Sequence, residues 1–156
     1  MSRSAPIRIL VVDDFQSYRK FISSSIQQKS EWQVVGEAAD GLEGVNRAQE
    51  LQPDLVLLDI GLPQLNGIEA ARRIRTLAPR SRIVFLSQEC SAEVVAEARH
   101  LGASGYISKD SDEILPLVFS KGRSFVRMKT PTCAKNHSTT MESTKMRSGK
   151  SKVSVM

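Results

Sequence analysis

Short apolar runs alternate with amphipathic stretches up to about residue 120 of the chain. The apolar runs are rich in β-branched residues and have the length of strands, and the stretches between them have the three-and-four spacing of helices. The expected strands are residues 7–12, 32–38, 54–59, 82–87 and 104–108. Several of these runs are apolar at nearly every position, which is typical of parallel strands covered on both faces. The pattern therefore predicts an α/β domain made of five βα repeats.

Four helices are expected from the apolar stripes that lie between the strands. The stripe residues should face the core. In chain order they are Phe15, Tyr18, Phe21, Ile22 and Ile26, then Leu42, Val45, Ala48 and Leu51, then Ile68, Ala71, Ile74 and Leu77, then Val94, Val95, Ala98 and Leu101.

Helix-breaking residues follow three of these stripes. Pro53, Pro79 and Gly102 come after the second, third and fourth stripes, where the helices are expected to end. A fifth helix is expected from about Asp112 to Lys121. Pro116 lies one turn inside it, and because proline lacks the N–H group and clashes with the preceding turn, we expect a kink or a late start.

The length and composition allow one ordinary globular domain. The chain has 156 residues, of which 40% are apolar, and no apolar run is long enough to cross a membrane. The N-terminus reaches Asp13 and Asp14 too soon for a signal peptide, so a cytoplasmic location is expected. Cys90 and Cys133 fit no metal-binding spacing and are expected to be free thiols.

The net charge of +5 is unevenly distributed. Residues 1–120 hold 13 basic and 16 acidic side chains, whereas residues 121–156 hold 9 basic and 1 acidic. We therefore expect an N-terminal extension at 1–5, one folded domain at 6–125 and a basic tail at 126–156. The tail has no aromatic residue and is expected to be disordered. A basic arm that binds nucleic acid or an acidic partner is the alternative.

Polar residues stand where the predicted strands end. Asp13 and Asp14 follow the first strand, Asp59 ends the third, Ser87 ends the fourth and Lys109 follows the fifth. Ligands of open parallel sheets bind beyond these carboxyl ends, so the five side chains are expected along one edge. Three carboxylates gathered there would raise one another's pKa unless a cation shared the site, and Mg²⁺ prefers oxygen ligands.

This combination of groups suits phosphoryl transfer. Mg²⁺ would neutralise the transferred group, Lys109 would add a positive charge and Ser87 would donate a hydrogen bond. Asp59 is then the candidate nucleophile, because an aspartate can accept a phosphoryl group as an acyl phosphate.

Four segments resemble the receiver domain of bacterial two-component response regulators. They are "VVDD" at 11–14, "LLDIGLPQLNG" at 57–67, "VFLS" at 84–87 and "GASGYISKD" at 102–110. The intervals between the matched residues agree with the family too: 46 residues from Asp13 to Asp59, 28 from Asp59 to Ser87 and 22 from Ser87 to Lys109. The resemblance covers about residues 6–125, and "GASGYISKD" with "KGRSFV" is similar to the NarL/FixJ type. It implies a flavodoxin-like, doubly wound, five-stranded parallel sheet of order 2-1-3-4-5 with five helices.

The resemblance implies a phosphorylation site with a bound metal. Asp59 matches the aspartate that is phosphorylated. Asp13 and Asp14 match the acidic pair that holds Mg²⁺ or Mn²⁺, Asp14 directly and Asp13 through water. Asp59 and the backbone carbonyl of Gly61 complete the implied ligands.

The remaining matched residues imply a switch. Ser87 and Tyr106 match the hydroxyl and aromatic pair that moves on phosphorylation, and Lys109 matches the lysine that pairs with the phosphate. A sensor histidine kinase would phosphorylate Asp59, and the phosphorylated form would signal to a downstream partner or homodimerise. The implied surfaces are the face of the fourth helix, fifth strand and fifth helix, or helices one and five. The protein would modify its own side chain, so it is not expected to be a turnover enzyme.

The chain departs from the family pattern at three places. After Phe125 no apolar periodicity predicts a DNA-binding helix-turn-helix, so a receiver acting alone or a truncated regulator is expected. Asp110 follows Lys109 where many receivers have proline. Gln88 follows Ser87 where the family usually has a small residue, and we hypothesise that it slows the access of phosphodonors.

Other interpretations of these residues remain open. Taken alone, Asp13 and Asp14 could cap a helix, and Lys109 could be solvated. A nucleotide-binding enzyme would need a glycine-rich turn after the first strand, and "VVDDFQSYRKF" has none. A degenerate receiver that binds proteins independently of phosphorylation is the main alternative.

Overall fold

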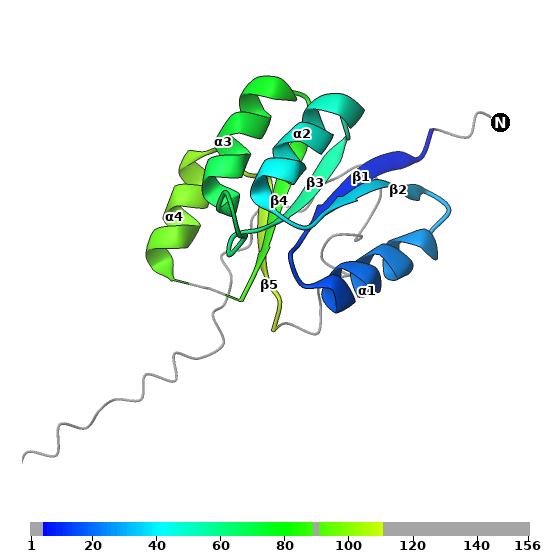
Figure 1. Ribbon diagram of the computed structural model, residues 1–156, viewed down its shortest axis with the longest axis horizontal. Helices are drawn as coiled ribbons and strands as arrows, with labels where there is room; N and C mark the ends of the chain where they lie inside the picture. The colour runs from blue at the N-terminus through cyan, green and yellow to red at the C-terminus, as the bar shows by residue number, and fades with distance from the viewer. Residues whose placement is uncertain (1–4, 89–90, 111–156) are drawn as a thin grey trace, which may run out of the picture.

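The computed structural model of the chain describes residues 5–88 and 91–110, where strands and helices alternate (Figure 1). The strands are β1 (Ile7–Val12), β2 (Trp32–Ala38), β3 (Leu55–Asp59), β4 (Arg82–Ser87) and β5 (Gly105–Ser108). The helices are α1 (Gln16–Gln27), α2 (Gly41–Leu51), α3 (Gly67–Leu77) and α4 (Ala92–His100). Three strands have the predicted bounds, and β3 and β5 each begin one residue later than predicted.

The five strands form one parallel sheet of order β2-β1-β3-β4-β5. The chain starts at β1, moves to the edge at β2 and returns past β1 to β3. Helix α1 lies on one face of the sheet, and α2, α3 and α4 lie on the other (Figure 1). The predicted doubly wound α/β fold is confirmed. The fifth helix expected at 112–121, its Pro116 and the basic tail lie outside the described residues.

Strand β3 is the most buried part of the sheet, because all five of its residues are buried. Its side chains alternate between the two faces. Val56 and Leu58 belong to the apolar core beneath α2 and α3, whereas Leu55 and Leu57 belong to the core beneath α1. Burying each such side chain contributes about 1.5–3 kcal/mol. Asp59 is therefore the last residue of a strand that is packed against apolar side chains on both faces.

Four residues that the stripes assigned to the core are exposed: Phe15 (65%), Phe21 (55%), Leu42 (47%) and Leu77 (38%). That prediction is wrong for them. Phe15 precedes α1 in an extended conformation and so lies off the helix face. Phe21 is next to the fully buried Ile22, and because adjacent helical residues point about 100° apart, Phe21 lies away from the centre of the buried face.

The helices after α1 begin at side-chain caps. The side chains of Asp40, Asn66 and Ser91 each accept a hydrogen bond from the backbone N–H three residues later. Helices α2, α3 and α4 each end two residues before the predicted breakers, which are Pro53, Pro79 and Gly102. Gly102 has a φ of +73°. Within residues 5–88 and 91–110, none of the helices combines the length and the apolar character needed to cross a bilayer.

Candidate functional site

The ends of β1, β3 and β4 bring the predicted polar residues together. Val12 pairs with Leu58, so the next residues in the two strands, Asp13 and Asp59, lie side by side. On the other side of β3, Asp59 pairs with Leu86, which precedes Ser87. The strand order reverses between β1 and β3, and this is where open α/β sheets form a crevice for ligands.

The backbone and one carboxylate oxygen of Asp13 are fixed by hydrogen bonds. Its N–H donates to the Ala38 carbonyl (3.0 Å), and its carbonyl accepts from Arg19 Nη1 (2.6 Å). Its Oδ1 accepts from the backbone N–H of Phe15 (2.9 Å). Phe15 is the residue at the N-cap position of α1, so the interpretation of the aspartates as helix caps is wrong. Only Oδ2 of Asp13 is left for other partners.

Asp59 is almost fully buried, with 7% of its surface exposed, and both of its carboxylate oxygens have partners. Oδ1 accepts a hydrogen bond from the backbone N–H of Gly61 (3.3 Å), and Oδ2 accepts one from Lys109 Nζ (3.0 Å). The following loop folds back tightly, because the N–H of Gly67 donates to the Ile60 carbonyl (2.8 Å). A side chain at Gly67 would collide with the backbone of Asp59 and Ile60.

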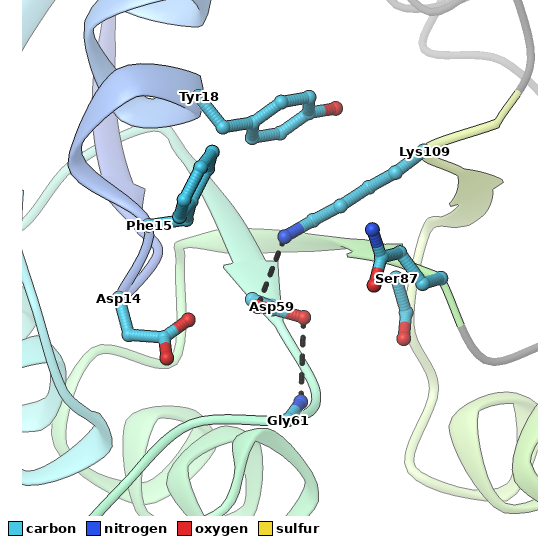
Figure 2. Close-up of a pocket in the computed structure, with 8 residues that line it drawn as sticks. Asp14, Phe15, Tyr18, Asp59, Gly61, Ser87 and Lys109 are labelled. Carbon is cyan, nitrogen blue, oxygen red and sulfur yellow. Dashed lines mark hydrogen bonds and ion pairs between the residues drawn. The ribbon is translucent and has the colours of Figure 1, made fainter.

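Lys109 spans the crevice from β5 to β1. Its backbone N–H donates to the Ser87 carbonyl (3.0 Å), which extends the ladder between β4 and β5. Its Nζ lies 2.5 Å from Asp13 Oδ2 and 3.0 Å from Asp59 Oδ2. The same Nζ is 4.6 Å from the centroid of the Tyr18 ring. Figure 2 shows the lysine reaching toward Asp59 below this ring.

Burial and charge shift three pKa values at the site. Burial raises the pKa of Asp13, although Lys109 and the Phe15 N–H oppose it. Burial works to lower the pKa of Lys109, but the two carboxylates outweigh it and raise this pKa above its ordinary value. Burial and the charges of Asp13 and Asp59 raise the pKa of Tyr18, which keeps its phenol neutral. The Lys109 ammonium therefore stays charged at neutral pH.

The acidic residues fit a divalent cation that prefers oxygen ligands. Asp13, Asp14 and Asp59 each offer one oxygen, and these three atoms lie within 4.8 Å of one another. One lysine cannot balance three carboxylates. Asp13 Oδ2 is buried, and among the described residues its partner is the Lys109 ammonium, 2.5 Å away. The donor set and charge match what Mg²⁺ requires.

An open pocket of about 620 Å³ lies above these groups (Figure 2). The described residues that line it are Asp14, Phe15, Tyr18, Asp59, Gly61, Ser87, Gln88 and Lys109. The structure brings together around this pocket five of the predicted site residues, namely Asp14, Asp59, Gly61, Ser87 and Lys109. A sixth, Asp13, contacts Lys109.

Tyr106 is the predicted site residue that lies apart from this pocket. It is 4% exposed and belongs to the core beneath α2 and α3. Its ring centroid lies 6.4 Å from that of Phe85 on the neighbouring strand. The structure therefore places the Tyr106 ring in the core on the face of the sheet that α2 and α3 cover, rather than at the pocket surface.

Phe15 and Tyr18 line the pocket, although their spacing had assigned them to the core. Their position carries a signal that could have revealed this. They follow Asp13 and Asp14 directly, and the first turn of a helix after a parallel strand lies over the carboxyl edge of the sheet. Gln88, identified only as a departure from the family pattern, also lines the pocket next to Ser87.

Comparisons with known proteins agree with this geometry. The family model of the response regulator receiver domain matches residues 9–116. The nitrate/nitrite response regulator protein NarL of Escherichia coli is 38% identical over 112 residues, which are 72% of this chain and 52% of NarL. The chain thus spans about half the length of such relatives. The matched domain is a receiver and is not catalytic in itself.

Two solved structures are also similar. A LuxR-family two-component response regulator from Aurantimonas sp. has a TM-score of 0.73 and 32% identity, covering 81% of this chain and 91% of that one. The CheX–CheY–BeF₃–Mg²⁺ complex from Borrelia burgdorferi has a TM-score of 0.65 and 26% identity, covering 69% and 81%. An acidic cluster of this kind is typical of receiver domains that bind Mg²⁺.

Proposed function

Since the chain belongs to the response regulator receiver family, we propose that it is a signalling switch phosphorylated on Asp59. One observation carries the assignment. Asp59 lies at the floor of an open pocket, and the Lys109 ammonium holds its Oδ2 at 3.0 Å. A carboxylate in this place is reachable by a phosphodonor and is next to a cation that can bind the incoming group.

The phosphoryl group would come from a phosphohistidine of a sensor histidine kinase or from a small acyl phosphate. A carboxylate oxygen of Asp59 attacks phosphorus, the bond from phosphorus to the donor breaks, and the donor leaves with its electron pair. Mg²⁺ or Mn²⁺, when bound by Asp13, Asp14, Asp59 and the Gly61 carbonyl, supplies positive charge to the phosphoryl oxygens. Lys109 supplies a further positive charge from the opposite side of the pocket.

The new phosphoryl oxygens would shift the protein between two states. Ser87 lines the pocket, so its hydroxyl is placed to donate to one of them. Tyr106 pairs with Phe85, two residues before Ser87 on β4, and its ring packs near that of Phe85 in the core. We propose that a move of Ser87 toward the phosphoryl group lets Tyr106 repack, which changes the face of α4 and β5.

The receiver fold implies a cognate histidine kinase as the upstream partner. The changed surface would then bind a downstream protein or a second copy of this chain, through α4 and β5 or through α1. We also propose that residues 6–125 form the receiver and 126–156 a separate basic tail. A phosphorylation-independent binding module is the outcome that would replace this proposal.

Intact mass measurement after incubation with acetyl phosphate and Mg²⁺ tests the proposal. The wild type should gain the mass of one phosphoryl group, and alkali should remove it. Asp59→Asn should gain nothing. Asp54→Asn is the matched control, because Asp54 lies at the opposite end of β3 and accepts a hydrogen bond from Arg8. A folded wild type that gains no phosphoryl group from several donors would favour the binding module.

A further inference from the structure

Tyr18 is a pocket residue that the proposed chemistry leaves without a role, and its ring contacts Lys109. It is the third residue of α1, and it lines the pocket above Asp59. Lys109 Nζ lies 4.6 Å from the centre of its ring, within the range of a cation–π interaction. Figure 2 shows the ring and the end of the lysine close together on the α1 side of the pocket.

Three groups hold the Lys109 ammonium in this structure: Asp13 Oδ2, Asp59 Oδ2 and the Tyr18 ring. Both carboxylates belong to the proposed metal site, and Asp59 is also the proposed phosphoryl acceptor. Their oxygens must therefore change partners during the reaction. The Tyr18 ring binds neither a metal ion nor a phosphoryl group, so it can keep the ammonium in place throughout.

The ring face of Tyr18, and not its hydroxyl group, is the part that can act on Lys109. The hydroxyl oxygen is buried and has no hydrogen-bond partner among the described residues. The phenol stays neutral, because burial and the nearby carboxylates raise its pKa. A neutral aromatic ring presents a negative face to a cation, whereas the unpaired hydroxyl contributes nothing to this contact.

We propose that Tyr18 is a positioning residue that holds the Lys109 ammonium beside Asp59 through its ring face while Asp13 and Asp59 exchange partners. The proposal rests on the proposed phosphorylation of Asp59. It predicts that the aromatic ring is required and the hydroxyl is not. It also predicts that the contact between the Tyr18 ring and Lys109 Nζ persists when Mg²⁺ is present.

Four variants separate this role from simple packing. Tyr18→Leu and Tyr18→Met both remove the ring with different side-chain shapes, so one can replace the other if either fails to fold. Tyr18→Phe keeps the ring and removes the hydroxyl. Phe21→Leu is the matched control, because it removes an exposed ring that lies 6.3 Å from Tyr18 on the same helix.

The first readout is the proton NMR shift of the Lys109 methylene next to Nζ, measured with Mg²⁺ and without a phosphodonor. The wild type, Tyr18→Phe and Phe21→Leu should show an upfield shift from the ring, and the two ring-less variants should lose it. An unshifted signal in the wild type would overturn the proposal. This readout requires no phosphorylation.

The second readout is the rate of phosphorylation by acetyl phosphate at saturating Mg²⁺. Loss of the ring should lower the rate about two- to fivefold, the equivalent of a cation–π contact of about 0.5–1 kcal/mol, and Tyr18→Phe should keep the wild-type rate. Equal rates in the wild type and the folded ring-less variants would overturn the proposal, as would a Tyr18→Phe rate as low as theirs. If the wild type is not phosphorylated, the proposed function fails, and the NMR shift alone decides the role of Tyr18.

Discussion

Asp13 is a carboxyl group of the site whose ionisation the folded protein opposes. It is 1% exposed, its Oδ1 is committed to the Phe15 N–H, and its Oδ2 depends on Lys109. Burial raises its pKa above the ordinary 3.8. The ionised carboxylate therefore costs stability, which is consistent with a pocket arranged for binding a cation rather than for stability.

Asp13→Asn should change how stability depends on pH. Between pH 3.8 and the raised pKa of Asp13, the folded wild type binds more protons than the unfolded chain, so its free energy of unfolding falls as pH rises. The variant lacks this group. The stability difference, variant minus wild type, should thus grow through this window and then level off, by about 1.4 kcal/mol for each unit of pKa shift.

Urea unfolding without Mg²⁺, from acidic to neutral pH, measures this difference. Lys109 adds no slope of its own, because its pKa is raised and it stays charged over the whole range. A difference that shrinks as pH rises would show that Asp13 is better stabilised as a carboxylate than its burial indicates.

Gln88→Ala should speed phosphorylation several-fold. The Gln88 side chain lines the pocket next to Ser87, where a phosphodonor must enter. Removing the amide widens this entrance without touching Asp59 or Lys109. Stopped-flow or quenched-flow rates with acetyl phosphate measure the effect. A rate in the variant equal to or below that of the wild type would reject Gln88 as an obstacle.

Among the elements, the turn from β3 into α3 controls the geometry around Asp59. Gly67→Ala should destabilise the protein by about 3 kcal/mol or more, because the added Cβ meets the backbone of Asp59 and Ile60, which cannot easily move. Gly61→Ala is the control for stability. A Cβ there meets no atom within 4 Å, so we expect a change of about 0.5 kcal/mol or less. Similar unfolding midpoints for the two variants in urea would contradict this account.

The strands and their ends could be predicted because β3 and its neighbours are buried on both faces. Their apolar runs then fix the bounds, and the register of parallel strands brings Asp13, Asp59 and Ser87 to one edge. Helix faces were less predictable. A one-dimensional stripe did not show that Phe15 lies before α1 or that Phe21 points away from Ile22.

Contacts between elements could not be predicted from spacing. The ring of Tyr18 meets Lys109, 91 residues later in the chain, only because the lysine side chain reaches from the end of β5 across the crevice to the first turn of α1. The burial of Tyr106 also depends on how the β4–β5 edge packs. Both features follow from the assembled sheet and not from the spacing of residues along the chain.

For the molecule as a whole, the sheet topology gathers three carboxylates at one edge, and binding of a cation there should stabilise the fold. Mg²⁺ at about 100 times its Kd should raise the free energy of unfolding by about 2.7 kcal/mol. Asp14→Asn should reduce this gain, because Asp14 offers one of the three clustered oxygens. Among the described residues Lys109 forms its ion pairs with Asp13 and Asp59 and not with Asp14, so the loss of the Asp14 charge should not disturb the lysine.

Thermal unfolding with and without Mg²⁺, at constant ionic strength, measures this gain. Na⁺ at the same ionic strength is the control for general screening. An equal gain in the wild type and in Asp14→Asn, or an equal gain with Na⁺, would contradict a specific cation site at this edge.

The position of the acyl phosphate tests the central claim most directly. Borohydride reduces an aspartyl phosphate to homoserine with release of phosphate, and this leaves a permanent mark on the modified residue. After incubation with acetyl phosphate and Mg²⁺, reduction and peptide sequencing by mass spectrometry, we predict homoserine at position 59 and aspartate at positions 13, 14 and 54. Homoserine at another aspartate, or unmodified Asp59 in a protein that has gained a phosphoryl group, would contradict the account.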